Sequence, residues 1–187
     1  MPARIEAFTG QDITNSRTGQ RMVFRTTASD SNGELLAMEC WSPPDGPGIP
    51  PEPVHTHPNQ EKSIRVIEGE LTVRVNGEER ILRAGEEVIV PADAVHSFWN
   101  PSGAEAHYWS EFRPALRTAE FFVTLFALAR DGKLNKDGMP SMPQIMSSGE
   151  RFQREIMVVS PPPLIQKVSF ALLGPLMRAF GYHPEHE

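Results

Sequence analysis

Short runs of alternating apolar and polar residues, separated by turn residues, occupy the chain from residue 20 to about 113. RMVFRTTA and GELLAMECW form two such runs around the turn SDSNG, and residues 64–91 alternate over much of their length. Asn76-Gly77 within the longer run is typical of a tight hairpin, because both residues tolerate positive φ. EAHYWSEFR predicts a further strand. Evenly spaced short strands without intervening helices predict an all-β sandwich or barrel.

The periodicity changes after Pro114. In RTAEFFVTLFALARDG, apolar residues at 122, 125, 126 and 129 share one helical face, and Gly132 follows as a cap. Residues 164–180 repeat this pattern, and Gly174-Pro175 is expected to kink or break the second helix. Between the helices, residues 133–160 are expected to form a loop with one short helix. The sequence thus predicts two regions, residues 1–113 with the strands and residues 114–187 as a helical C-terminal extension.

The composition excludes several classes of partner. The net charge of −6 disfavours nucleic acid, whose phosphates require a basic surface. The chain contains neither a secretory signal pattern nor a run of about 18 apolar residues, and residues 164–180 carry only two basic residues. The single cysteine, Cys40, cannot form an internal disulfide, which fits a reducing compartment. We therefore expect a cytoplasmic protein without membrane contact.

Two histidines in the segment PEPVHTHPNQEKSIRVIEGE are candidate metal ligands. Residues two apart in a strand face the same side, so His55 and His57 would project into one space. Imidazoles suit a divalent transition metal such as Fe, Mn, Ni, Cu or Zn. An HxH pair alone is a weak signal. A third histidine, His96, follows the turn PADAV and strengthens it.

These segments together resemble the two sequence motifs of the cupin superfamily, and the resemblance covers residues 20–113. The matching positions are Gly48, His55, His57, Glu61 and Gly69 in the first motif, and Gly85, Pro91, His96 and Asn100 in the second. Asp93 stands where the family usually has glycine, and aspartate tolerates left-handed backbone better than most residues. The resemblance implies a double-stranded β-helix, or jelly-roll barrel, with a metal held by His55, His57, Glu61 and His96.

One position of the first motif is ambiguous. Counting back from Gly69 places Lys62, not Glu61, where the family has its glutamate, and Lys62 shares a strand face with Ile64 and Val66. A bulge could turn Glu61 inward, and the spacing from His57 favours this alternative. Alternatively, the three histidines hold the metal with water in the open positions. In a third alternative, Lys62 lies inward and repels a cation, and the site is vestigial or binds an anion.

Four further residues are candidates for the pocket: Lys62, Phe98, His107 and Glu111. His107 and Glu111 share a strand face with Trp109, which could line the barrel or form a solvated edge. Either Phe98 or Trp99 should form a wall of the pocket.

The resemblance is specific for the fold and weak for the activity, because cupins perform many reactions. One hypothesis is a metal-dependent oxidoreductase, such as a dioxygenase, acting on a small organic substrate. The alternative is a non-catalytic cupin that binds a small ligand at a degenerate metal site. The apolar faces of the helices after residue 114 must be buried on the barrel or on a second subunit, and the resemblance implies a homodimer.

Overall fold

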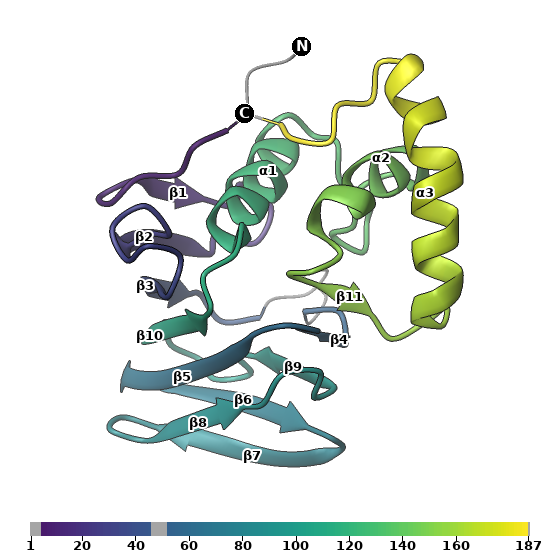
Figure 1. Ribbon diagram of the computed structural model, residues 1–187. Helices are drawn as coiled ribbons and strands as arrows, with labels where there is room; N and C mark the ends of the chain where they lie inside the picture. Colours follow the sequence, from purple (N-terminus) through teal and green to yellow (C-terminus); the bar gives the residue numbers. More distant parts are fainter. Residues whose placement is uncertain (1–4, 46–51, 187) are drawn as a thin grey trace.

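Two antiparallel sheets and three C-terminal helices make up the protein (Figure 1). The computed structural model describes residues 5–45 and 52–186. The six-stranded sheet has the order β1 (Asp12–Thr14), β2 (Arg21–Thr26), β3 (Leu36–Ser42), β10 (Ala106–Arg113), β5 (Glu61–Glu68), β8 (Glu87–Val90). The five-stranded sheet has the order β11 (Met157–Val158), β4 (His55–Thr56), β9 (His96–Trp99), β6 (Glu70–Val75), β7 (Glu78–Arg83).

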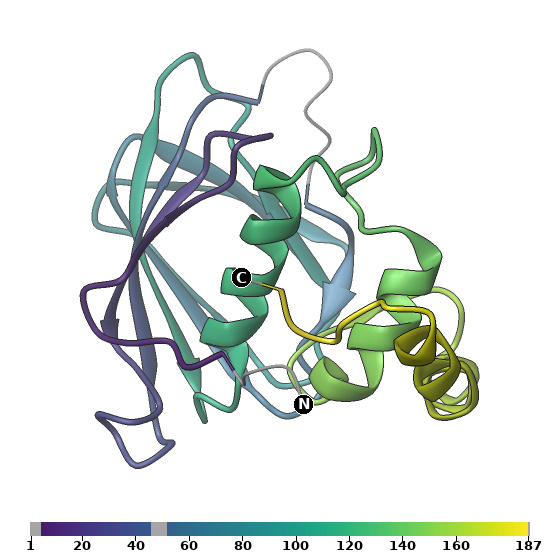
Figure 2. The same ribbon diagram turned by 90° about the horizontal axis from the view of Figure 1, so that it is seen from above.

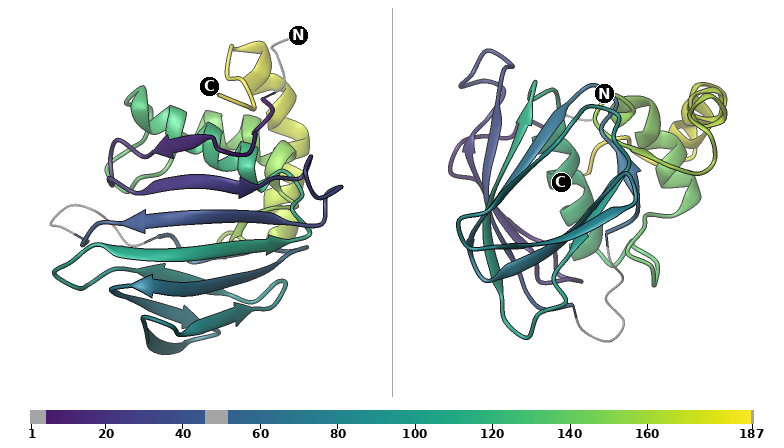
Figure 3. Two further views of the ribbon diagram at one scale, coloured as in Figure 1. Left: turned by 90° about the vertical axis from the view of Figure 1, so that its left-hand side faces the viewer. Right: turned by 90° about the horizontal axis from the view of Figure 1, so that it is seen from below.

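The two sheets enclose the apolar core between them. Seen from below, their strands lie on opposite sides of a central space (Figure 3). The buried side chains that fill this space come from both sheets, and they include Met38 of β3, Ile64 of β5, Leu71 of β6 and Tyr108 of β10. Within residues 5–45 and 52–186, no ladder of hydrogen bonds joins one sheet to the other. The predicted all-β architecture is therefore present, but the two sheets do not close into the continuous barrel expected from the sequence.

Tight turns with positive φ set the register of the strands. Asn76 and Gly77 connect β6 and β7 with φ of 50° and 88°, which confirms the predicted hairpin. Asp93 has φ of 63°, so this aspartate occupies the left-handed conformation expected of it. Gly69 has φ of 79°, and a Cβ there would lie 2.8 Å from the carbonyl oxygen of Glu105. Only glycine fits where β5 turns into β6 against the start of β10.

Helix α1 (Thr118–Arg130) forms where the sequence predicts it, after Pro114. Seen from above, the helix lies across the opening between the two sheets (Figure 2). Its residues Phe122, Val123 and Phe126 belong to the same buried cluster as the inner faces of the sheets. The apolar stripe of α1 therefore completes the core of the strand region.

The remaining chain forms α2 (Met142–Phe152), β11 and α3 (Pro163–Ala179). The short helix within residues 133–160 was predicted, but β11 was not. Helix α3 runs through Pro175 without interruption, so the expected break is absent. This helix packs on α2 and lies outermost in Figure 1. Much of its apolar surface is open, with Leu164 and Leu172 more than 70% exposed.

Candidate metal centre

The side chains of His55, His57 and His96 meet on the inner face of the five-stranded sheet. His55 in β4 pairs directly with His96 at the start of β9, and His57 follows β4 by one residue. All three side chains are buried, with 1%, 4% and 1% of their surface exposed. One ligand atom from each residue lies within 4.8 Å of the others. His55 and His57 thus face the same side, as their two-residue spacing predicts, and their imidazoles lie beside that of His96.

Backbone carbonyls fix the orientation of each imidazole ring. In His55, Nδ1 lies 2.8 Å from the carbonyl oxygen of Pro53. The Nδ1 of His57 lies 2.6 Å from the carbonyl oxygen of Glu155, and the Nδ1 of His96 lies 2.9 Å from that of Ala94. A carbonyl oxygen can only accept, so each Nδ1–H donates and the neutral ring keeps its lone pair on Nε2. Such outer partners orient histidine ligands in metal sites.

The Nε2 atoms converge without a partner for their lone pairs. The Nε2 atoms of His55 and His57 are 3.3 Å apart, and the buried Nε2 of His96 has no hydrogen-bond partner within the described part of the chain. Buried polar atoms are rarely left unpaired, and three converging imidazole lone pairs are a donor set for a divalent transition metal. The arrangement therefore fits such an ion.

Burial also keeps these imidazoles neutral. Desolvation, followed by the charge of Lys62, lowers the pKa of His55 and of His96 to about 3. The pKa of His57 lies well below its ordinary value, first through burial and then through Lys62. Metal binding requires the unprotonated ring, so the three histidines are in the ligand form at neutral pH.

Glu61 lies outside this group, whereas Lys62 points into the core. Strand β5 begins at Glu61 and keeps regular pairing with β8 and β10 over its first residues, without the bulge that would turn Glu61 inward. The Glu61 side chain is exposed, whereas Lys62, Ile64 and Val66 are buried on the inner face. The prediction that Glu61 lies inward is therefore wrong. The alternation of side chains along β5, and not the spacing from His57, decides which residue faces the core.

Of the other pocket candidates, Phe98 lines the interior and two residues do not. Strand β10 buries Ala106, Tyr108, Ser110 and Phe112, so His107 and Glu111 face outward by parity. His107 Nε2 lies 2.8 Å from the Glu39 carboxylate, and the His107 ring stacks on Trp41. Glu111 accepts hydrogen bonds from Trp109 and Arg113. Their expected place in the pocket is therefore wrong, and both side chains lie half-buried on the outer face of the six-stranded sheet.

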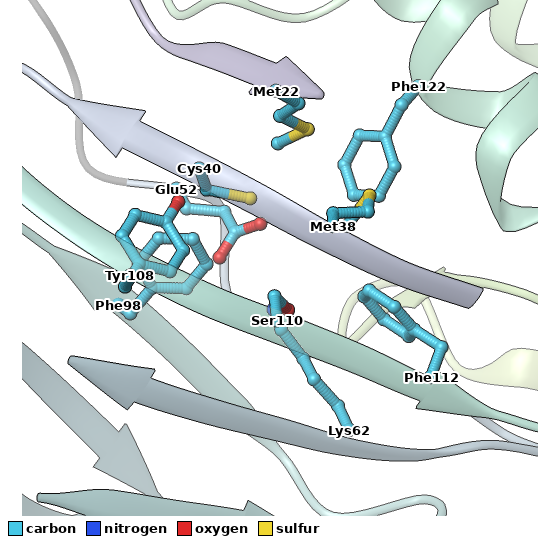
Figure 4. Close-up of a pocket in the computed structure, with 10 residues that line it drawn as sticks. All are labelled: Met22, Met38, Cys40, Glu52, Lys62, Phe98, Tyr108, Ser110, Phe112 and Phe122. Atoms are coloured by element: carbon cyan, nitrogen blue, oxygen red, sulfur yellow. The ribbon is translucent and has the colours of Figure 1, made fainter. Parts of the chain in front are cut away.

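A small pocket lies between the sheets beside Lys62 (Figure 4). Its lining residues are Met22, Met38, Cys40, Glu52, Lys62, Phe98, Tyr108, Ser110, Phe112 and Phe122. Its free volume is about 10 Å³, roughly the space of one water molecule. A second cavity of about 130 Å³ lies next to it, and Glu52 and Phe98 line both cavities. Glu52 and Phe98 therefore separate the inner pocket from the outer cleft.

Glu52 is the charged residue among those lining the pocket that the sequence did not predict. Its carboxylate points into the pocket in Figure 4, and its Oε2 is buried without a hydrogen-bond partner among the described residues. The available signal was its place between Pro51 and Pro53, which favour extended backbone ahead of the HxH pair. Gly48 of the first motif lies outside the described residues.

Lys62 carries the second unpaired charge of this pocket. Its Nζ lies 4.5 Å from the ring centroid of Phe98 and 5.5 Å from that of Phe112. Burial lowers the pKa of Lys62, and the charge of Glu52 opposes that shift. Among the described residues, no carboxylate oxygen lies within 4.0 Å of its ammonium.

Comparison with known proteins supports the sequence resemblance. Residues 45–110 match the family model for the cupin domain. The polyketide synthase CurC of Streptomyces cyaneus is 30% identical over 101 residues, which cover 50% of this chain and 66% of that protein. The chain thus spans 66% of the length of this curated relative.

Solved structures with a similar course of the chain include an RmlC-like cupin from Shewanella frigidimarina. It is 25% identical, with a TM-score of 0.47, over 60% of this chain and 93% of that one. Another is a protein from Thermotoga maritima described as a predicted oxalate decarboxylase, which is 18% identical, with a TM-score of 0.48, over 61% of this chain and 99% of that one. No helix in the described residues is long and apolar enough to cross a membrane. The family model is matched across both histidine motifs, so residues 45–110 form a domain of the cupin family.

Proposed function

We propose that this chain is a metal-dependent cupin enzyme that acts on a small organic substrate. The observation that carries the proposal is the convergence of three buried Nε2 atoms, each on a ring held through Nδ1 by a backbone carbonyl. Three histidine ligands leave positions open for a substrate, as in catalytic metal sites. A bound metal would supply Lewis acidity toward a substrate oxygen and, if redox active, the electron transfer of a dioxygenase.

The protein residues contribute orientation and a dry environment. His55, His57 and His96 would hold Fe, Mn, Ni, Cu or Zn, and the Met and Phe side chains of the pocket exclude water. Polyketides are built from 1,3-dicarbonyl units, and the CurC relative is named a polyketide synthase. We therefore propose a 1,3-dicarbonyl compound, or a phenol formed from one, as the substrate class for dioxygenation.

Metal content and oxygen uptake test this function. Protein purified without a histidine tag should contain close to one transition metal per chain, and His55→Ala and His96→Ala should each lose most of it. Oxygen consumption with acetylacetone should require the redox-active metal. The His107→Ala variant is the matched control, because His107 faces outward, and it should keep both metal and oxygen uptake. A wild type that binds no transition metal would refute the proposal.

The second candidate function is a non-catalytic cupin that binds a small ligand. The buried Lys62 favours this function, because an ammonium beside the histidines opposes a cation. Absence of metal together with retention of an organic ligand after purification would select it. The homodimer and the cytoplasmic location expected from the sequence stay predictions, which sedimentation velocity and cell fractionation test.

A further inference from the structure

Helix α3 exposes the apolar half of its surface. The residues concerned are each between 43% and 73% exposed, and they are Leu164, Ile165, Val168, Leu172, Leu173, Leu176 and, directly after the helix, Phe180. At about 3.6 residues per turn, these seven positions fall on one half of the helix, and its charged residues, Lys167 and Arg178, fall on the other. A surface helix ordinarily turns its apolar stripe toward the core, whereas this apolar face of α3 points away from it.

Contacts with α2 and β11 hold the helix in this orientation. Phe170, on the buried half of α3, fills the space beside Gly149 of α2, where a Cβ would lie 2.5 Å from its ring. Gln166 is also buried and donates a hydrogen bond to the carbonyl oxygen of Val158 in β11 at 2.7 Å. Turning the apolar face inward would break both contacts, so the fold itself directs this face outward.

The area of the apolar face matches what a protein interface requires. With about half of each residue exposed, the seven residues present on the order of 700 Å² of apolar surface. The largest apolar patch on a typical monomer is about 300–600 Å², and each partner in a stable complex contributes roughly 800 Å². The apolar face of α3 is therefore large enough to be the centre of an interface.

A second copy of the chain is the partner that fits this face. Elsewhere in the described residues, large apolar side chains are exposed no more than once per strand or helix, so the matching apolar surface on another copy is α3 itself. Such an isologous contact closes at a dimer. Residues 164, 168, 172, 176 and 180 of the face recur every four positions, in the row by which helices pack against each other. Helix α3 lies at the edge of the molecule in Figures 1 and 2, where a second copy can reach it.

A lipid surface fits the apolar face less well. Helices that lie on anionic membranes carry many basic residues along their polar side. Helix α3 has two, Lys167 and Arg178, and Arg178 is paired with Glu150 of α2 at 2.9 Å. The net charge of the chain is −6, which also opposes an anionic surface.

From these contacts we infer that α3 is the dimerisation element of this protein, packing antiparallel against α3 of a second copy about a two-fold axis at Leu172, the middle of the four-residue row. The sequence resemblance implies a homodimer without indicating the surface that forms it. Helix α3 lies outside residues 45–110, which match the cupin family model, and outside the three histidines. The inference therefore requires neither the family nor the metal.

The oligomeric state of the full chain tests this interface. Wild type should sediment as a dimer at micromolar concentration. Leu172→Glu should raise the dissociation constant of the dimer by roughly a hundredfold or more, because it would bury an unpaired charge at the centre of the interface. Leu164→Glu is the second variant; both residues are more than 70% exposed, so far-UV circular dichroism should be unchanged. The matched control is Ile89→Glu, which replaces an exposed apolar residue of β8 and should remain a dimer.

Cysteine cross-linking tests the antiparallel arrangement. With a short bis-maleimide, Leu172→Cys should link to its own counterpart, because the axis passes beside it. Phe180→Cys should not, because eight residues from the axis place the two copies of this position about 24 Å apart. Cys40 is buried, so the wild type should stay unlinked. Efficient linking of Phe180→Cys to itself would contradict the antiparallel pair.

Three results would overturn the inference. The first is a wild type that remains monomeric throughout the micromolar range. The second is a dimer that Ile89→Glu dissociates and Leu172→Glu does not, which would place the interface on the strands. The third is flotation of the wild type with vesicles of phosphatidylcholine and phosphatidylglycerol that Leu172→Glu abolishes, which would assign the apolar face to a membrane. Zinc titration tests the proposed function separately, so either can fail without the other.

Discussion

Lys62 is buried beside the three histidines, where its positive charge opposes the binding of a cation. We predict that Lys62→Glu tightens zinc binding by roughly tenfold or more, because it removes a like charge and supplies a carboxylate. Glu61→Gln should have no effect, since Glu61 is exposed. Isothermal titration of both variants with zinc measures this. Weaker binding in Lys62→Glu, or a marked loss in Glu61→Gln, would contradict the inward position of Lys62.

Cys40 should be chemically inert in the native protein. Burial raises the pKa of its thiol to about 12, and only the thiolate reacts. Well below that pKa the thiolate is scarce, so reaction with Ellman's reagent at pH 8 should be slow and should accelerate as the pH rises toward 12. The urea-unfolded chain, with an ordinary thiol pKa of about 8.5, serves as the control and should react at once at pH 8. Rapid labelling of the folded protein at pH 8 would contradict the prediction.

For the residues in and around the candidate metal centre, the sequence predicts which way a side chain points only where the local strand periodicity decides it. The two-residue spacing of His55 and His57 places both on one side, and the same parity applied to β5 places Lys62 inward. For His107, parity alone did not say which face of β10 was buried, because Trp109 shares its side. Glu52 lies before the strand, where no periodicity reports its direction.

At the scale of elements, Glu155 connects the C-terminal region to the histidines. Its backbone carbonyl accepts the Nδ1–H of His57, and its Oε1 accepts the backbone N–H of Arg117, the residue before α1, at 3.1 Å. The next residues form β11, where Val158 pairs with His55. The segment 155–158 therefore fixes both the ring of His57 and the edge of the histidine strand.

Two truncations isolate this contribution. Ending the chain after Val159 removes α3 and the terminal segment, whereas ending it after Gln153 also removes Glu155 and β11. We predict that the longer form keeps near-native zinc affinity and that the shorter form loses roughly ten- to hundredfold, the usual effect of removing an outer partner of a metal ligand. Zinc titration and circular dichroism on both forms measure this. Equal zinc affinity in two folded truncations would show that β4 orients His57 without the C-terminal segment.

Elements whose signals are local were predicted well. The Asn76-Gly77 hairpin and helix α1 follow from turn residues and an apolar stripe within a few positions. Strand β11 has two residues, and its partner β4 lies about 100 positions earlier, so no local pattern reports it. Helix α3 continues through Pro175 because packing against α2 outweighs the hydrogen bond that proline removes.

At the scale of the molecule, α1 packs into the core of the strand region, across the predicted boundary between the two regions at residue 113. Phe122 of α1 packs on Phe112 of β10, with ring centroids 6.1 Å apart, and lines the inner pocket. Val123 and Phe126 are buried in the same core. Burying three such side chains contributes on the order of 5 kcal/mol, comparable with the whole stability of many domains. The predicted regions, residues 1–113 and 114–187, therefore share one core.

Deleting residues 114–187 tests this dependence. The remaining strands would expose the apolar surface that α1 covers, so we predict that the fragment aggregates or fails to fold. Deletion of residues 160–187 alone is the control; it removes α3, whose apolar side chains are largely exposed, and should leave a folded protein. Size-exclusion chromatography and thermal unfolding distinguish the two. A monomeric 1–113 fragment with a cooperative unfolding transition would establish the strand region as an independent domain. It would show that this region folds without α1.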